Sequence, residues 1–347
     1  MTTHEDELTL PVDLCTPDGV HLNPAALGWS RVPLHRANLD GLPGRNKRWD
    51  YWCIQAGDLV VSAVYADIDV IGLADVYWVD LASGAAGGRS IIAAPDAGIH
   101  LPQRCGAAPL SVDHDGLALR LTDDPSATRI EATWTEADGR PGRLSAEIGR
   151  PEGLESVNVV IPWSDDEFNF TSKQWARPVV GQLSVGERTW VLDAAPDGAW
   201  GALDVGRGRW PSVIRWNWGG GHGSTDGHVV GVQFGAKWTE GTGFTENGIV
   251  VDGRVSKIGR ELTWDYDWDR PLDPWTVTDP DGQIELVLTP RFDKHGALGD
   301  LGTGDGDLGS ETHQVFGTWS GRIVTDDGIE VAVDGLQGFA EEARQHW

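Results

Sequence analysis

The sequence has little cysteine, lysine and methionine, and it has no long hydrophobic run. It contains 3 Cys and 1 Met among 347 residues, and only five of its residues are Lys. The 27 Lys and Arg stand against 53 Asp and Glu, so the net charge is −26. Nucleic acids and anionic membrane surfaces are both bound through clustered basic residues. The composition therefore argues against nucleic acid and against an anionic membrane as partners.

The cysteines and the first residues show no sign of export. Cys15, Cys53 and Cys105 are odd in number and widely spaced, and no CxxC pair or zinc-type Cys/His spacing is present. Such usage is typical of reduced, buried thiols in a cytoplasmic protein. The acidic start, Met1-Thr-Thr-His-Glu-Asp-Glu, lacks the basic and apolar segments of a signal peptide. No run approaches the roughly 18 apolar residues of a membrane helix. We therefore expect a cytoplasmic protein without stable membrane insertion.

Short segments in which apolar and polar residues alternate fill most of the chain, and they are separated by many of the 46 Gly and 19 Pro. Asp-Gly pairs recur between these segments, and this dipeptide is typical of tight β-hairpins. Helical periodicity is nearly absent, and only Phe339–Trp347 favours a helix. The segments repeat at about 8–12 residues, which predicts an all-β protein of the sandwich or barrel kind.

The number of predicted strands exceeds what one small barrel holds. About ten precede residue 162 and as many follow residue 173, and a single barrel of about twenty strands would enclose a wide channel. We therefore expect two antiparallel barrels in tandem, at residues 1–165 and 166–347, with a short C-terminal helix. The predicted junction is Pro162–Ser172. The acidic, Gly-rich segment Asp300–Gly309 is expected to be a solvated loop, with calcium binding as the alternative.

Tryptophan is the most unusual part of the composition, with 18 Trp against 7 Phe and 4 Tyr. In Trp216-Asn217-Trp218, the two-residue period of a strand places both indoles on one face. Trp264 and Tyr266 share a face for the same reason. These rings are either packed core or the walls of an apolar cavity for a flat or elongated hydrophobic ligand. Sugar stacking is a third interpretation, and the missing export signal counts against it.

The densest group of polar residues surrounds a Gly-rich turn. A strand pair would bring Asn217, Gln233 and Lys237 to matching positions, and Glu240 and Glu246 would flank the turn. Burial beside tryptophan raises the pKa of a carboxyl group and lets it act as a general acid. We therefore take Glu246 and Glu240 as candidate catalytic residues. The alternatives are carboxylates that only cap loop backbone, and a glycosidase pair, whose carboxyl separation a sequence does not supply.

The remaining candidates are assigned to ligand binding. They are Asn217, Trp218, His222, Gln233, Lys237, Trp238, Asn247, Trp264 and Tyr266. The sequence has no HExxH motif, Walker motif or dinucleotide fingerprint, so we expect no metal and no cofactor.

Several strings of the sequence resemble the bacterial family DUF2804 over nearly the whole chain. They are Lys47-Arg48-Trp49-Asp50-Tyr51-Trp52, Arg209-Trp210-Pro211, Thr239-Glu240-Gly-Thr242-Gly-Phe-Thr245-Glu246-Asn247-Gly248, Arg291-Phe-Asp293 and Val315-Phe316-Gly-Thr-Trp319. The family implies no activity. In architecture the chain is similar to the carotenoid hydratase and tocopherol cyclase group, which implies paired lipocalin-like barrels that act on isoprenoids without a cofactor.

These observations predict a protein that binds a hydrophobic, isoprenoid- or lipid-like small molecule in a Trp-lined cavity. Acid–base chemistry on that molecule would be a hydration, cyclisation or isomerisation. A non-catalytic carrier or sensor is the alternative, and a carbohydrate-active protein is the third possibility. The sequence leaves the oligomeric state open.

Overall fold

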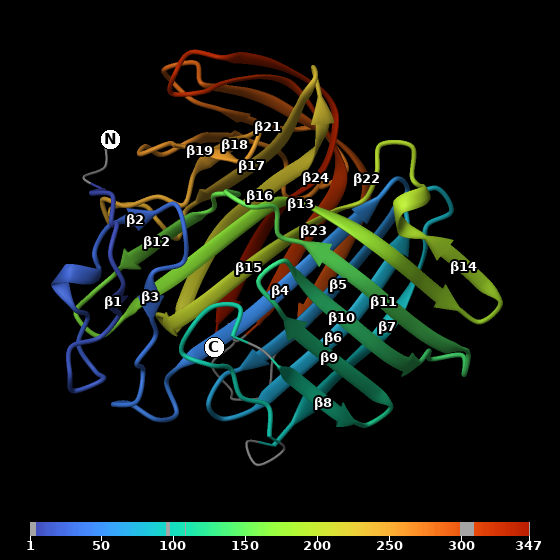
Figure 1. Ribbon diagram of the computed structural model, residues 1–347, viewed down its shortest axis with the longest axis horizontal. Coiled ribbons are helices and arrows are strands. Elements are labelled where there is room, and N and C mark those ends of the chain that lie inside the picture. The colour runs from blue at the N-terminus through green and yellow to red at the C-terminus, as the bar shows by residue number, and fades with distance from the viewer. Residues whose placement is uncertain (1–4, 95–97, 108, 299–308, 347) are drawn as a thin grey trace.

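The computed structural model describes residues 5–94, 98–107, 109–298 and 309–346. Within these residues the chain forms β-strands, two 3-10 turns named η1 (Pro24–Ala26) and η3 (Leu192–Ala194), and no α-helix. The prediction of an all-β protein is confirmed. The strands build a nearly closed barrel and a half-barrel (Figure 1). The predicted loop or calcium site at residues 300–308 lies outside the described residues.

The first sheet has 13 strands and takes up the N-terminal part of the chain. Its strands are β2 (Trp29–Ser30), β4 (Lys47–Ala56), β5 (Leu59–Asp67), β6 (Gly72–Asp80), β7 (Ala85–Ala93), β8 (Leu110–His114), β9 (Leu117–Asp123), β10 (Ala127–Thr135), β11 (Pro141–Gly149), β12 (Val157–Pro162), β13 (Phe168–Val185), β14 (Arg188–Val191) and β15 (Trp200–Arg209). The main path runs β7-β6-β5-β4-β15-β13-β11-β10-β9-β8. Before it, β1 (Val12–Asp13) and β3 (His35–Arg36) form a separate parallel pair.

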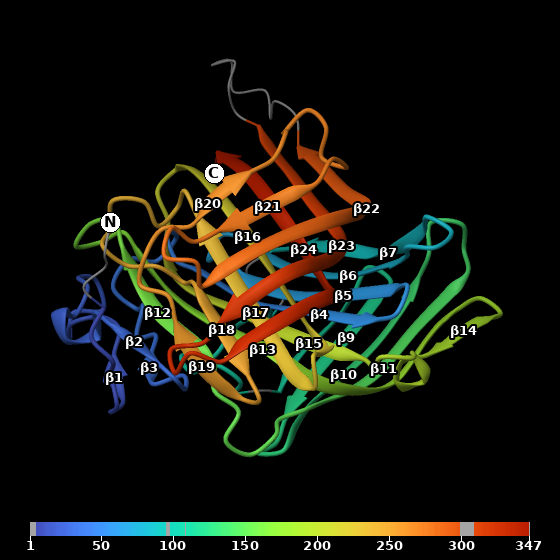
Figure 2. The same ribbon diagram turned by 90° about the horizontal axis from the view of Figure 1, so that it is seen from above.

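The second sheet has 9 strands and contains the rest of the chain. Its strands are β16 (Val213–Thr225), β17 (His228–Ala236), β18 (Gly248–Val251), β19 (Arg254–Lys257), β20 (Thr263–Asp265), β21 (Trp275–Thr278), β22 (Ile284–Leu298), β23 (Ser310–Val324) and β24 (Glu330–His346). Their order is β19-β18-β17-β16-β24-β23-β22-β21-β20. Figure 2 shows this sheet, in yellow to red, curving next to the blue and green strands of the first sheet.

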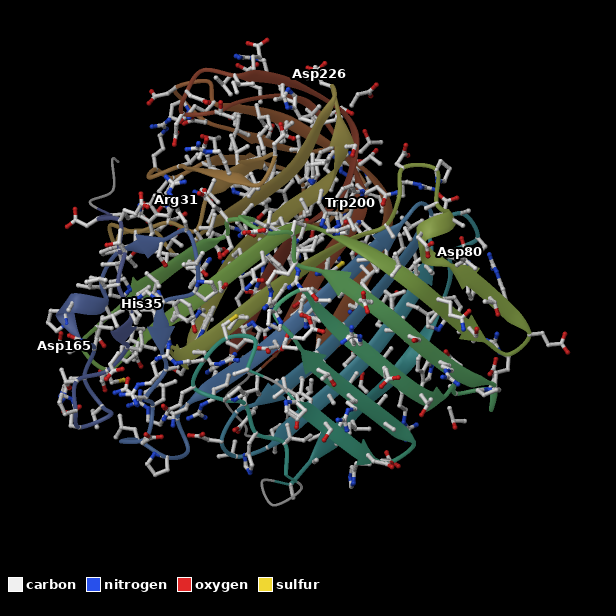
Figure 3. The ribbon with its side chains drawn as sticks, in the orientation of Figure 1. Arg31, His35, Asp80, Asp165, Trp200 and Asp226 are labelled. Atoms are coloured by element: carbon white, nitrogen blue, oxygen red, sulfur yellow. The ribbon has the colours of Figure 1, made fainter. Side chains whose placement is uncertain are left out.

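The chain passes from the first sheet to the second between Arg209 and Val213. The predicted junction lies elsewhere, in the turn that joins β12 to β13, where Pro162 pairs with Phe168 across one hairpin. The division of the chain at residue 165 stays a prediction. Figure 3 shows His35 within the N-terminal segment and Asp226 at the tip of the β16–β17 hairpin.

The predicted C-terminal helix is wrong, because Phe339–Trp347 falls within or directly after β24. This strand pairs on one side with β16 and on the other with β23. Both faces are buried: Phe339 packs against the first sheet, whereas Ala340 packs inside the second. The Ala, Glu and Arg residues here favour a helix locally, but two rows of ladder hydrogen bonds and burial on both faces outweigh that preference.

The concave interior of each sheet is filled by its own apolar core. In β4, Trp52 and Ile54 point into the core of the first sheet. Their neighbour Cys53 lies on the opposite face, where it joins Trp218 and Phe339 in a cluster shared by both sheets. Period-two alternation thus gives β4 one face for its own core and one for the second sheet. The three cysteines are free thiols. No helix in the described part of the chain has the length and hydrophobicity to cross a bilayer.

A run of glycines makes room for tryptophan rings from both sheets. Each residue of Gly219–Gly221 lies against an indole, that of Trp264, Trp175 and Trp319 in turn, and an added Cβ would lie 3.0, 2.3 and 2.9 Å from those rings. Trp175 reaches this position from a bulge in β13, where Ala176 has a φ of +57°. The glycine block near Trp218 therefore accepts tryptophan rings.

Candidate functional site

A cavity of about 390 Å³ lies between the two sheets, outside both apolar cores. The first sheet contributes residues of β4, β5, β13 and β15 to its walls, and the second contributes β16, β22, β23 and β24. Exposed His295 and Gly296 mark its rim. Five tryptophans line it: Trp49, Trp210, Trp216, Trp218 and Trp238. The site is thus an inter-sheet cavity, not the interior of one barrel.

The indoles of this wall pack on one another. Trp210 stacks on Trp238 with ring centroids 5.2 Å apart and planes at 10°, and its ring also lies 5.6 Å from Trp49. Tyr51 meets Trp218 edge to face at 5.4 Å. Since these rings cover part of each other's faces, the wall is apolar and preorganised. Sugar stacking requires an open indole face. This arrangement, in which the rings cover one another, suits an apolar ligand instead.

One buried lysine holds two carboxylates at the cavity wall. Lys173 Nζ lies 2.8 Å from Asp204 Oδ1 and 3.1 Å from Glu246 Oε2. The register explains the first contact, because Lys173 on β13 pairs directly with Asp204 on β15. Asp204 also accepts hydrogen bonds from Trp49 Nε1 at 3.1 Å and from Thr171 Oγ1 at 3.3 Å. Lys173 further sits 4.6 Å above the Trp218 ring, a cation–π contact.

Glu246 is the carboxyl group with the most unusual environment. Its side chain is 1% exposed, and burial raises its pKa to about 7 although Lys173 opposes that shift. Trp238 Nε1 donates a hydrogen bond to Oε1 at 3.0 Å. Oε2 contacts Lys173 as an ion pair but receives no hydrogen bond within the described residues. Glu246 therefore holds or releases a proton close to neutral pH, directly at the cavity.

Two further polar side chains face the same space. Asn169 is fully buried, and neither its amide nitrogen nor its amide oxygen has a hydrogen-bond partner among the described residues. Glu341, on β24, accepts a hydrogen bond from Trp216 Nε1 at 2.7 Å, and burial raises its pKa to about 7. An unpaired buried amide costs about 1–3 kcal/mol. Asn169 is therefore available for a hydrogen bond from the cavity.

The sequence matches the family model described as "Domain of unknown function (DUF2804)" over residues 5–347. The chain belongs to the DUF2804 family. The resemblance predicted from the sequence is thus confirmed.

Two solved structures that are similar to this DUF2804 chain share little sequence with it. CghA, crystallised with Sch210972, is 11% identical with a TM-score of 0.49, and the match covers 97% of this chain and 98% of CghA. Kievitone hydratase from Nectria haematococca (C2 SG) is 12% identical with a TM-score of 0.46, covering 88% of this chain and 91% of the hydratase. None of the curated proteins matches the sequence.

The cavity of the DUF2804 chain receives three of the predicted site residues, Trp218, Trp238 and Glu246. The prediction that Trp216 and Trp218 share a face is confirmed, since both line the cavity. Glu240 is exposed and borders a shallow surface depression instead. Glu240 and Glu246 therefore do not face a common cavity.

Asn217, Lys237 and Tyr266 form a second polar cluster away from the cavity. The Tyr266 hydroxyl receives hydrogen bonds from Asn217 Nδ2 at 2.9 Å and from Lys237 Nζ at 2.6 Å, and it donates one to Glu342. Trp264 packs with Trp275 beside this cluster. The two segments pair as β16 and β17, but the predicted matching positions are wrong. Asn217 lies opposite Ala236 and Gln233 opposite Gly220, so their side chains are on opposite faces, and Lys237 follows the end of β17.

The other three predicted residues, Gln233, Asn247 and His222, are buried and do not line the cavity. Gln233 Oε1 accepts hydrogen bonds from Trp175 Nε1 and Trp218 Nε1, at 2.8 and 3.2 Å. Asn247 accepts one from the Gly235 backbone at 2.7 Å. His222 is fully buried with both ring nitrogens unpartnered in the described chain, and burial lowers its pKa to about 3.

Sequence reasoning missed Asn169, Thr171 and Lys173. They occupy alternate positions of β13 and share the face that lines the cavity, whereas Phe168 and Phe170 lie on the other face. Alternation alone does not single out that face, because Ser172 and Gln174 on the opposite face are polar as well.

Gly235 leaves the space that the Glu246 carboxyl group occupies. A Cβ at this position would lie 2.1 Å from Glu246 Oε1. We expect Gly235→Ala to push the carboxyl group off Trp238 and Lys173, and to lower the free energy of unfolding by about 1–3 kcal/mol. Chemical denaturation measures this. Gly296→Ala is the control, because no atom lies within 4 Å of its added Cβ; equal losses in both variants would contradict the expectation.

Proposed function

We propose that this protein binds an apolar small molecule in the inter-sheet cavity and that Glu246 exchanges a proton with it. The observation that carries the proposal is the position of Glu246, which is a buried carboxyl group with a pKa near 7 at a wall of tryptophans. An acid is most effective when its pKa lies near the working pH. Isoprenoid-like molecules fit the apolar wall, and the expected chemistry is a hydration, cyclisation or isomerisation.

The surroundings of Glu246 favour proton transfer in both directions. Trp238 fixes one carboxyl oxygen, and the other points to Lys173 without a hydrogen bond. When Glu246 gives its proton to an alkene carbon, the carboxylate that remains is stabilised by the Lys173 ammonium group 3.1 Å away. In a hydration, water then adds to the neighbouring carbon and returns a proton to Glu246, which balances the step.

Asn169 narrows the class of ligand. Its buried, unpartnered amide faces the cavity and both donates and accepts hydrogen bonds. A ligand with a hydroxyl or carbonyl oxygen satisfies this group, whereas a pure hydrocarbon leaves it unpaired. We therefore propose an oxygen-bearing, predominantly apolar molecule.

A ligand extraction followed by matched variants tests the proposal. Protein purified from its own host is extracted with organic solvent, and mass spectrometry identifies bound small molecules. Turnover of the extracted compound is then compared in three proteins. We expect Glu246→Gln to lose about 10²–10⁴-fold in rate while it still binds the compound. The control is Glu240→Gln, the same change at the exposed carboxyl group, which should retain both rate and binding.

The binding part and the catalytic part of the proposal are contradicted by different results. A protein that consistently yields no apolar compound contradicts the binding half. Equal turnover by wild type and Glu246→Gln contradicts the catalytic half.

A carrier or sensor is the second candidate, and the Lys173 contact favours it. An ammonium group 3.1 Å from Glu246 stabilises the ionised carboxylate, which is the form that does not donate a proton. If the protein is a carrier or sensor, a compound is extracted from it, and the wild-type protein does not convert that compound.

A further inference from the structure

Two histidines and a glutamate converge on neighbouring strands of the second sheet, on the face of β23 opposite to the cavity-lining Thr312 and Gln314. His295 on β22 pairs directly with His313 on β23, and Glu311 lies two residues before His313. His295 Nε2 lies 3.0 Å from Glu311 Oε1, and His313 Nε2 lies 4.0 Å from the same oxygen. One ligand atom from each of the three residues falls within 4.8 Å of the others. Two imidazoles and a carboxylate are ligands that Zn²⁺ and related transition metals prefer.

A carboxylate behind His313 fixes the ring as a metal ligand requires. His313 Nδ1 lies 2.7 Å from Asp293 Oδ2, and the His313 side chain is only 11% exposed. If Nδ1 carries the proton and donates it to Asp293, Nε2 keeps its lone pair, and Nε2 is the nitrogen on the side of Glu311. Most histidines that bind metals are oriented by such a carboxylate.

The distances between the three ligand atoms suit a bound ion once the His295 side chain has rotated. Zn–N and Zn–O bonds of about 2.0–2.1 Å in a tetrahedron place ligand atoms about 3.3 Å apart, and the two separations here lie on either side of that value. The His295 and His313 rings are nearly parallel, at 14°. A shared ion must lie close to both ring planes, so His295 has to rotate. Its side chain is 47% exposed and has room to do so.

We propose that His295, Glu311 and His313 form a binding site for one divalent transition-metal ion of the zinc class, oriented by Asp293. Three protein ligands leave one of four tetrahedral positions open. On β23 the cavity is lined by Thr312 and Gln314, so the alternating residues Glu311 and His313 hold the ion on the opposite face of the sheet, where an oxygen of water takes the fourth position. The site was not predicted from the sequence, because the three ligands match no short metal-binding motif.

Calorimetric titration of the tag-free full chain with ZnCl₂, in 0.15 M salt with excess Mg²⁺, tests the site. Wild type should bind one Zn²⁺, and His295→Ala and His313→Ala should each lose that binding. Asp293→Asn should weaken it about 10–100-fold, because a residue that orients a ligand acts indirectly. The matched control is His228→Ala, since His228 also pairs with a carboxylate, Asp252, at 2.7 Å but belongs to no group of three possible metal ligands within the described residues.

Tryptophan fluorescence gives an independent readout of position. The Trp268 ring lies 4.5 Å from the His313 ring, so Co²⁺ at the site should quench the part of the emission that Trp268→Phe removes. Absence of stoichiometric Zn²⁺ binding by wild type overturns the proposal. Binding that survives His295→Ala also overturns it, and because His295 is exposed this variant keeps the test valid even if His313→Ala does not fold.

Discussion

Lys173→Met is expected to lower the free energy of unfolding by about 3–5 kcal/mol, the largest effect of any single change at the cavity. The substitution keeps most of the side-chain volume but removes the charge that faces Asp204 and Glu246. Burial alone would lower the Lys173 pKa, yet the two carboxylates outweigh burial and raise it. Without the ammonium group, two buried carboxylates remain close together with no cation between them. Urea denaturation at neutral pH measures the loss.

A double-mutant cycle separates the charge effect from lost packing. In Lys173→Met/Glu246→Gln, one of the two unpaired charges is absent, so the double variant should be more stable than the sum of the single changes predicts. Contacting charged residues show coupling of about 0.5–3 kcal/mol. A loss below about 1 kcal/mol for Lys173→Met, or strictly additive losses, would mean that the ion pairs contribute little to the fold.

Local signals in the sequence were sufficient for part of this site. Glu246 was found because an acidic residue stands in a Gly-rich turn directly after strands rich in tryptophan. Trp216 and Trp218 were placed on one face because that inference needs only the period of a strand. Each of these inferences depends on residues within about ten positions of one another.

The contacts of Lys173, which the sequence did not predict, depend on the register between distant strands. Lys173 meets Asp204 through the pairing of β13 with β15, and it meets Glu246 through the packing of one sheet on the other. Alternation assigns a residue to a face, but it does not say what that face meets. The same limit explains the wrong C-terminal helix, because β24 is held by β16 and β23 and not by its local preferences.

The location of the cavity follows from how the chain distributes its large residues. Both sheet interiors are filled by aliphatic and aromatic side chains, and none of the residues that line the inter-sheet cavity belongs to either core. The tryptophans near Gly206 and Gly235 instead line the space between the two sheets. Gly206 lets the Trp49 ring lie flat on β15, since an added Cβ would be 2.0 Å from it. At this position the cavity wall thus consists of a tryptophan ring that lies over a glycine residue.

Glu341→Gln is expected to stabilise the protein at neutral pH and to have little effect at pH 4.5. Burial raises the Glu341 pKa from 4.5 to about 7. Between these two values the folded protein holds a proton that the unfolded chain has released, so this group's contribution to stability is complete below pH 4.5 and is lost as the pH rises towards 7. The loss is about 1.4 kcal/mol per pH unit, or roughly 3 kcal/mol over the window. Glutamine carries no such proton and still accepts the hydrogen bond from Trp216 Nε1 through its amide oxygen.

The difference between variant and wild type isolates this effect from other groups. Burial lowers the pKa of His35 to about 4 and that of His222 to about 3, and these histidines make stability rise with pH in the same range. They are present in both proteins and cancel in the difference. Urea denaturation at pH 4.5, 5.5, 6.5 and 7.5 should therefore show Glu341→Gln gaining steadily on wild type, whereas Glu240→Gln, the same change at an exposed position, should show a constant difference. A constant difference for Glu341→Gln as well would mean that its carboxyl group is ionised in the folded protein at these pH values, and that the cavity wall carries its negative charge.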